Sequence, residues 1–197
     1  MVDLPAPYRH ATPADAPALA HLVDIAGEGL PSYLWAQMAE EGETALDVGR
    51  WRARREEGSF SYRNAVVADP GGGVEAALVG YPLPDGPESI PDDLPAMFVP
   101  LQKLENLAGG TWYVNVLATY PEYRDQGHGT HLLGIAQRLA RAAGCRGLSL
   151  IVADTNFGAR RLYERSGFRP MASRRMVKEG WQGPGENFLL MIQEGTA

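Results

Sequence analysis

Hydrophobic positions recur along this chain with two different periods, and each change of period marks the boundary of a predicted element. Near the N-terminus, Leu19, Ala20 and Val23 are spaced as on one face of a helix, and Gly27 supplies a stop. The run 148–152 is continuously apolar, as expected for a strand that is buried on both faces. The other predicted strands are 8–11, 64–68, 74–81, 111–119, 168–177 and 187–193. The other predicted helices are 31–38, 44–57, 101–107, 130–143 and 156–166.

The order of these elements predicts the fold class. A first strand is followed by helices, a hairpin, a strand, a helix, a strand, a helix and two final strands, which is typical of an α/β domain with a mixed sheet. Residues 82–100 contain six prolines, which exclude regular structure from most of that stretch. We therefore interpret 82–110 as an insertion, a loop with a short helix, and 1–197 as a single domain.

Charge is distributed unevenly along the chain. The formal net charge of −6 argues against a general nucleic-acid binder. Residues 124–175 nevertheless contain ten arginines and three acidic residues. One interpretation is a set of solvated helix faces, and the other is a docking surface for a polyanionic small molecule. Charge alone does not choose between them.

Cysteine content and hydropathy indicate the compartment. Cys145 is the one cysteine, so no internal disulfide can form and a reducing compartment is the simplest setting. The N-terminal residues lack the basic flank and apolar core of a secretory signal, and no apolar run approaches the roughly 20 residues of a membrane helix. We therefore expect a cytoplasmic protein with no membrane partner. Frequent alanine and glycine, with arginine preferred over lysine, indicate a bacterial source with a GC-rich genome.

The segment 123–130 lies between a predicted strand and a predicted helix and contains two glycines, Gly127 and Gly129. Glycine lacks the β-carbon that would keep the backbone away from a ligand. The helix that follows presents unpaired N–H groups and the positive end of its dipole, and both favour phosphate oxygens. Arg124 and Thr130 add a cation and a hydroxyl at the rim. The segment is therefore a candidate phosphate-binding loop.

Two better-known phosphate loops do not fit this segment. A nucleotide P-loop needs lysine followed by serine or threonine after its last glycine, but Thr130 and His131 follow Gly129. A dinucleotide fingerprint needs a third glycine three positions after the second, where this chain has Leu132. On spacing alone, a turn without a ligand stays the alternative.

A second motif follows over 156–168, with the sequence Asn-x-x-Ala-x-x-Leu-Tyr-x-x-x-Gly-Phe. Together with Arg-x-x-Gly-x-Gly at 124–129, it resembles the GNAT superfamily of N-acetyltransferases. The resemblance is specific over about 111–170 and looser in the rest of the chain. It implies an α/β domain with a mixed, mostly antiparallel sheet, splayed central strands and flanking helices.

The resemblance also implies that the chain binds acetyl-CoA or coenzyme A. The strand before the loop would bulge, and its backbone would pair with the pantetheine amides as an added strand would. The N–H groups of the loop would bind the diphosphate. The implied cofactor-binding residues are Leu117, Ala118, Thr119, Arg124, Gln126, Gly127, His128, Gly129, Thr130, Asn156 and Tyr163.

The catalytic groups are implied in the same way. Tyr163 occupies the position at which many members of the family keep a general acid, and its ordinary pKa of about 10 suits proton donation to a departing thiolate. Packing against its helical neighbours is the structural alternative for this tyrosine. A backbone N–H group of the bulged strand, at Leu117, would stabilise the oxyanion. Glu28 and Glu122 are candidate general bases, and the sequence commits to neither.

The expected function is transfer of an acetyl group from acetyl-CoA to a primary amine by direct attack. The acceptor would be a small-molecule amine or a peptide N-terminus, and no nucleic acid is expected as a partner. His128 and His131 are spaced as a metal-binding pair can be, but no third ligand is suggested, so we expect no metal. A catalytically silent acyl-CoA-binding regulatory module stays the alternative function. Whether the chain forms a homodimer stays open.

Overall fold

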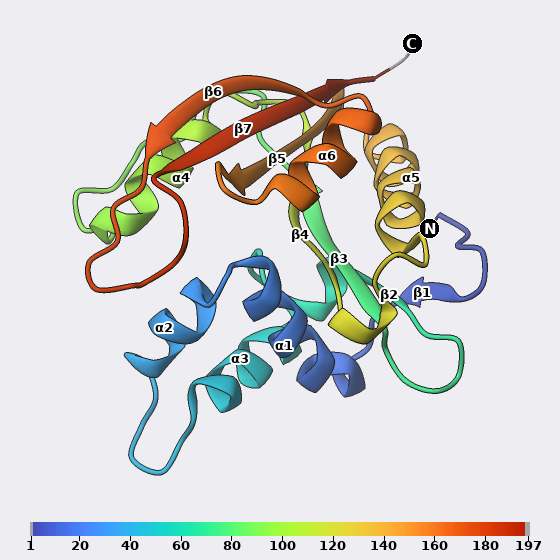
Figure 1. Ribbon diagram of the computed structural model, residues 1–197, viewed down its shortest axis with the longest axis horizontal. Helices are drawn as coiled ribbons and strands as arrows, with labels where there is room; N and C mark the ends of the chain where they lie inside the picture. Colours follow the sequence, from blue (N-terminus) through green and yellow to red (C-terminus); the bar gives the residue numbers. More distant parts are fainter. Residues whose placement is uncertain (1, 196–197) are drawn as a thin grey trace. The chain divides into compact units, whose positions relative to one another are not determined.

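The structure is a computed structural model, and it describes residues 2–195 (Figure 1). Its strands are β1 (Tyr8–His10), β2 (Ala65–Ala68), β3 (Ala76–Pro82), β4 (Trp112–Thr119), β5 (Gly147–Ala153), β6 (Arg169–Arg175) and β7 (Asn187–Glu194). Its α-helices are α1 (Ala16–Ala26), α2 (Leu30–Ala36), α3 (Ala45–Arg54), α4 (Val99–Glu105), α5 (His128–Ala142) and α6 (Phe157–Arg165).

These elements occur in the order that the sequence predicts, with differences at their ends. Helix α3 ends at Arg54 rather than near Glu57, because Arg55 adopts an extended backbone (φ −63°, ψ 148°). Helix α4 begins at Val99, two residues early, with proline in its first turn, where a missing N–H costs no helical hydrogen bond. Helix α5 begins at His128 rather than Thr130, so its first turn includes part of the glycine loop.

The strands follow the order β1-β2-β3-β4-β5-β7-β6 in a seven-stranded sheet. Strands β4 and β5 are parallel, whereas β1–β2, β2–β3, β5–β7 and β6–β7 are antiparallel. The mixed, mostly antiparallel sheet of an α/β fold is therefore confirmed. By its contacts the described chain forms two compact units, one comprising residues up to Gly80 together with Asn115–Ile135, the other comprising Tyr81–Val114 and residues from Ala136 onward.

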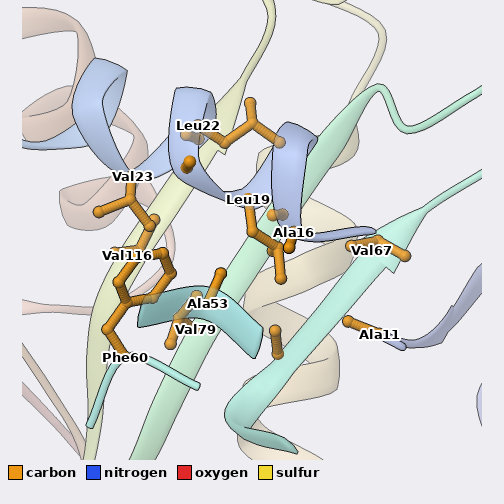
Figure 2. Packing of buried hydrophobic residues seen from close by; sticks show 14 of the residues in the cluster. Ala11, Ala16, Leu19, Leu22, Val23, Ala53, Phe60, Val67, Val79 and Val116 are labelled. Carbon is orange, nitrogen blue, oxygen red and sulfur yellow. The ribbon is translucent and has the colours of Figure 1, made fainter. Parts of the chain in front are cut away.

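The core of the first unit lies between its helices and its strands. Helices α1, α2 and α3 pack together (Figure 1). Figure 2 shows Leu19 and Val23 of α1 on the side of the helix that faces the strands. They belong to one buried cluster with Val67 of β2, Val79 of β3 and Val116 of β4. Burying a leucine or valine side chain contributes about 1.5–3 kcal/mol to the free energy of unfolding. This core therefore holds in place the part of β4 that leads into the glycine loop.

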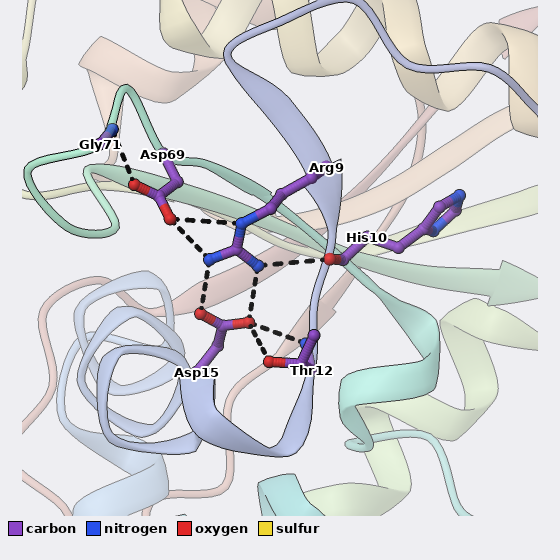
Figure 3. A network of polar contacts seen from close by, with 6 residues as sticks. All are labelled: Arg9, His10, Thr12, Asp15, Asp69 and Gly71. Atoms are coloured by element: carbon purple, nitrogen blue, oxygen red, sulfur yellow. Dashed lines mark hydrogen bonds and ion pairs between the residues drawn. The ribbon is translucent and has the colours of Figure 1, made fainter.

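A charged network joins β1 to the turn between β2 and β3 (Figure 3). The guanidinium group of Arg9 donates to both carboxylate oxygens of Asp15 at 2.8 and 2.9 Å, and to Asp69 at 2.6 and 3.2 Å. The backbone N–H of Thr12 also donates to Asp15 at 2.7 Å. Burial alone would raise the pKa of Asp15, but the hydrogen bonds from Arg9 and Thr12 outweigh it and lower that pKa.

Replacing Arg9 by alanine is expected to lower the free energy of unfolding by about 1–3 kcal/mol at neutral pH. The reason is that the Asp15 side chain, only 8% exposed, would keep its charge and lose its cation. Because the folded-state pKa of Asp15 is lowered, this stabilisation is present above the ordinary value of 3.8 and is lost as the pH falls below it. Urea denaturation of both proteins should therefore give a smaller difference at about pH 3 than at about pH 7.

The control for this substitution is Arg63→Ala. Arg63 also pairs with a carboxylate, Glu56, but the two side chains are 60% and 59% exposed. Removing an exposed pair should change the free energy of unfolding by less than about 1 kcal/mol. Equal losses in the two variants would show that burial of Asp15 does not determine the effect.

The second unit is built around β5. Residues Gly147–Ala153 pair antiparallel with β7, and Leu148–Leu150 pair in parallel with Trp112–Val114 of β4. Two buried hydroxyls, Thr111 and Ser149, lie 2.6 Å apart; because Thr111 donates to the carbonyl of Ala108 at 2.7 Å, Ser149 donates to Thr111. After β5 the chain turns directly into α6, and Gly167, with φ of +91°, then reverses it into β6. This strand–helix–strand order places the 156–168 motif at the end of a buried strand.

Candidate functional site

The glycine loop leaves β4 through a short turn, Pro121–Tyr123, and enters α5 at His128. Two of its residues have left-handed backbone conformations, Asp125 with φ of +61° and Gly127 with φ of +88°. The first α5 hydrogen bond is donated by the N–H of His131 to the carbonyl of Gly127 at 3.1 Å. The preceding N–H groups of the first turn therefore have no acceptor within the helix and are free for a ligand. This is the arrangement that favours a bound anion.

The predicted side chains of the loop lie at its rim. Arg124, Gln126 and Thr130 are exposed, and Gly127 is exposed with them. A β-carbon at Gly127 would meet only the ring of His131, at 3.4 Å. The exposed backbone thus leaves room for a group that approaches it, with a guanidinium group and a hydroxyl nearby to bind phosphate oxygens.

The predicted pantetheine-binding residues are the last three residues of β4, before the loop. Ala118 is buried in the core of the first unit, whereas Leu117 and Thr119 are only partly buried. Because side chains alternate along a strand, Leu117 and Thr119 lie on the face opposite Ala118. The structure thus brings Leu117, Ala118 and Thr119 into the same unit as residues 124–130.

The two histidines near the loop do not share a ligand. The Nε2 of His128 lies 3.0 Å from Glu75, whereas the Nδ1 of His131 lies 3.0 Å from the carbonyl oxygen of Gly127. Across residues 2–195 there is no cluster of three or more His, Cys, Asp or Glu side chains suited to a metal ion. The histidines have structural partners instead.

The second part of the predicted site lies on α6, in the second unit. Asn156 is the N-cap residue of this helix, and its side-chain oxygen accepts a hydrogen bond from the N–H of Ala159 at 3.1 Å. Tyr163 lies seven residues later, and so on the same face of the helix. Its ring packs against Phe168, with the ring centres 5.8 Å apart. One short helix therefore carries both predicted residues.

Burial changes the acidity of Tyr163. Its side chain is 8% exposed, and this burial raises the pKa of Tyr163 to about 12, above the value of about 10 assumed from the sequence. Among residues 2–195 its hydroxyl group has no hydrogen-bond partner. The phenol therefore stays protonated at neutral pH and keeps a free O–H for donation.

Comparison with known proteins decides the family. A family model described as the acetyltransferase (GNAT) family matches residues 33–168. The chain belongs to this family. No match is found among curated proteins.

Solved GNAT-like structures share the fold at low sequence identity. An N-acetyltransferase from Staphylococcus aureus Mu50 is 18% identical over 95% of this chain and 100% of its own, with a TM-score of 0.63. The ribosomal-protein-S18-alanine N-acetyltransferase from Escherichia coli is 18% identical over 96% and 94%, with a TM-score of 0.58. A GNAT family acetyltransferase from Elizabethkingia anophelis, solved with acetyl-CoA bound, is 17% identical over 66% and 74%, with a TM-score of 0.50.

The structure of this GNAT chain also reveals an acidic group that the sequence analysis missed, Glu105 at the end of α4. Burial raises the pKa of Glu105 to about 7, and the carboxylate of Glu88 adds to the rise. Burial, together with Glu105, Tyr81 and Tyr163, raises the pKa of Tyr113 well above its usual value. A carboxyl group with a pKa near 7 can accept and release a proton at neutral pH. The one sequence signal for burial of Glu105 was its position four residues after Leu101, on the same helix face.

The raised pKa of Glu105 predicts how stability depends on pH. The folded protein binds this proton up to about pH 7, whereas the unfolded chain releases it near 4.5. Stability should therefore fall as the pH rises from about 4.5 to about 7. Replacing Glu105 by glutamine should raise the free energy of unfolding at about pH 8 by about 1–3 kcal/mol, with little change at about pH 5.

Urea denaturation at the two pH values measures this effect. The control is Glu164→Gln, which removes an exposed carboxylate from α6. An equal increase in the free energy of unfolding in both variants would contradict burial of the Glu105 carboxyl group as the cause. An increase for Glu105→Gln that does not depend on pH would contradict it as well.

The two carboxylates that the sequence offered as bases lie in different settings. Glu122 is exposed in the turn before the loop. Glu28 is partly buried between α1 and α2 and has a left-handed backbone with φ of +52°. Glu105 is a third candidate, and burial raises its pKa to about 7.

No helix within residues 2–195 combines the length and the apolar character that crossing a bilayer requires.

Proposed function

We propose that this chain is an N-acetyltransferase that moves the acetyl group of acetyl-CoA to a primary amine. The observation that carries the proposal is the exposed loop 124–127, which leads directly into the free N–H groups at the start of α5. Membership of the acetyltransferase (GNAT) family supports it, because the family is named for acetyl transfer. The acetyl-CoA bound in the Elizabethkingia anophelis protein supports the choice of donor.

The residues present fit this donor. The diphosphate would take the N–H groups of Gln126, Gly127, His128, Gly129 and Thr130, with Arg124 at the rim. The left-handed conformation of Gly127 and the space beside it leave the backbone open to an anion. The backbone of Leu117, Ala118 and Thr119 would pair with the pantetheine amides, and Asn156 would meet the same arm.

The thioester supplies an acyl carbon that is open to attack by an amine. In the overall exchange a C–N bond forms and a C–S bond breaks, the amine loses one proton and the leaving sulfur gains one. The N–H group of Leu117 would stabilise the negative charge that develops on the carbonyl oxygen. Tyr163 would supply the proton to sulfur, and the candidate bases for the proton on the amine are Glu28, Glu122 and Glu105.

The raised pKa of Tyr163 determines how it would act. A thiol ionises near 8.5, so complete transfer from a phenol with a pKa of about 12 is uphill by roughly 3 to 4 units, or about 5 kcal/mol. Tyr163 would therefore first donate a hydrogen bond that strengthens as negative charge develops on sulfur, and would complete the proton transfer only as the C–S bond breaks.

The whole chain would function as one acyl-CoA N-acyltransferase domain, with 82–110 as an insertion. Its acceptor would be a small-molecule amine or a peptide N-terminus. The Escherichia coli relative, named for an alanine of ribosomal protein S18, is the reason for including peptides in the test.

The test measures free thiol released from acetyl-CoA in the presence of primary amines and of short peptides with free N-termini. Thermal shift with CoA, ATP and NAD tests binding separately, since a ligand that binds the folded state raises the melting temperature. We expect stabilisation by CoA alone, and thiol release with at least one acceptor. Stabilisation by CoA with no thiol release for any acceptor would indicate the silent acyl-CoA-binding module. Stabilisation by ATP or NAD instead would contradict the loop assignment.

A further inference from the structure

His128 is the one residue of the glycine loop whose side chain turns inward. Its exposed fraction is 9%, whereas Gln126, Gly127 and Thr130 beside it are exposed. A buried imidazole is stable only when its ring nitrogens have partners. The surroundings of this ring therefore show what the loop is attached to.

Both ring nitrogens of His128 have a partner in the first unit. The Nε2 lies 3.0 Å from a carboxylate oxygen of Glu75, the residue just before β3. The Nδ1 lies 3.3 Å from the hydroxyl oxygen of Tyr8 in β1, which is 7% exposed. We call Tyr8, Glu75 and His128 the histidine clamp.

The chemistry of the partners determines the direction of each hydrogen bond. A carboxylate can only accept, so the Nε2 of His128 carries the hydrogen that it donates to Glu75. In the neutral ring, Nδ1 then accepts from the hydroxyl of Tyr8. Burial, followed by the charge of Glu75, raises the pKa of Tyr8, so this hydroxyl keeps its hydrogen. All three groups of the clamp are thereby satisfied.

Glu75 also holds the other end of the loop. Its carbonyl accepts a hydrogen bond from the N–H of Tyr120 at 3.0 Å, where the chain leaves β4. Its own N–H donates to the carbonyl of Ala68 at 2.9 Å, which ties it to β2. One residue of the β2–β3 hairpin therefore holds the chain at both position 120 and position 128, on either side of the segment with the two left-handed residues.

A loop of this kind is expected to be mobile unless it is held at its ends. Ordering one backbone residue costs about 1–2 kcal/mol, and a ligand that must order several residues binds correspondingly less tightly. A loop ordered in advance removes that cost from binding. The clamp holds His128, the first residue of α5, in the turn whose N–H groups are free, and this suits the role.

We infer that His128 is a positioning residue, whose side chain, held by Glu75 and Tyr8, keeps residues 124–130 ordered for the diphosphate before acetyl-CoA binds. This inference rests on the proposed function for its ligand. It assigns to the side chain of His128 a role separate from that of its backbone N–H group.

The test compares two acetyl donors in steady-state kinetics. Acetyl-CoA contains the diphosphate, whereas S-acetylpantetheine carries the same thioester and pantetheine arm without it. Replacing His128 by leucine should raise KM for acetyl-CoA about 10- to 100-fold, with kcat changed less than about 3-fold. KM for S-acetylpantetheine should change less than about 3-fold, because this donor does not use the loop.

Conservative variants separate positioning from folding. His128→Gln can place an amide N–H near the position of Nε2, so it should recover part of the affinity for acetyl-CoA that His128→Leu loses. Glu75→Gln keeps an acceptor oxygen and should fall between the wild type and Glu75→Ala. His21→Leu, at an exposed position on α1, controls for loss of a histidine elsewhere. An equal rise of KM for both donors, or no rise for either, would overturn the inference.

A measurement without ligand keeps this test apart from that of the proposed function. Backbone ¹⁵N relaxation should give rigid order parameters, about 0.85, for residues 124–130 of the wild type and lower values in His128→Leu. Equal order parameters for residues 124–130 in the wild type and in His128→Leu would overturn the inference, even if the wild type acetylates amines. A wild type that neither binds CoA nor releases thiol would instead refute the proposed function.

Discussion

Replacing Gly127 by aspartate should abolish binding of acetyl-CoA, whereas asparagine at the same position should weaken it only moderately. Gly127 has φ of +88°, a conformation that costs a residue with a β-carbon about 1–2 kcal/mol. Both variants carry this strain, and both place a side chain of the same size near His131. Only aspartate adds a negative charge to the loop that binds the diphosphate.

The charge effect should be large. Two unit charges about 4 Å apart repel by about 4 kcal/mol at the effective dielectric constant of a protein surface, which corresponds to several hundred-fold in affinity. Isothermal titration calorimetry with CoA measures the difference between the two variants directly. The strain shared by both should appear as an equal loss of melting temperature without ligand. Equal affinities of the aspartate and asparagine variants for CoA would show that the diphosphate does not bind at this loop.

Replacing Tyr163 by phenylalanine should lower kcat about 100-fold or more and leave the Kd for CoA within about 3-fold of the wild type. The hydroxyl has no hydrogen-bond partner among the described residues, so its removal leaves no unsatisfied group, and the ring keeps its contact with Phe168. The stability of the variant should therefore be close to that of the wild type. Turnover under saturating acetyl-CoA, with the best acceptor of the panel, measures the effect.

The pKa of Tyr163 adds a second check. A general acid acts in its protonated form, so its contribution is present below its pKa and is lost as the pH rises through that value. With a pKa of about 12, Tyr163 should cause no loss of turnover between about pH 8 and pH 10. An unchanged kcat in Tyr163→Phe would show that Tyr163 contributes to packing and not to catalysis.

Much of the fold was predictable because its signals are local. Gly27 and Gly167 end helices, Asn156 starts one, and the prolines of 82–100 exclude regular structure from most of that stretch, each through the conformations that these residues allow or forbid. Such preferences act within a few residues and can be recognised in the sequence. The ends of α3 and α4 were less accurate, because Arg55 and Val99 carry no comparable signal.

By itself, then, the sequence determined the order of elements, the exposed glycine loop before α5 and the pairing of Asn156 with Tyr163 on one helix, since each depends on contiguous residues. The tertiary structure alone decided which side chains meet across 53 residues, as His128 and Glu75 do. It also decided how far burial shifts the pKa values of Glu105 and Tyr163. The physical reason is that desolvation and long-range hydrogen bonds depend on distances that only folding sets, whereas turns, caps and helical faces follow from neighbouring residues.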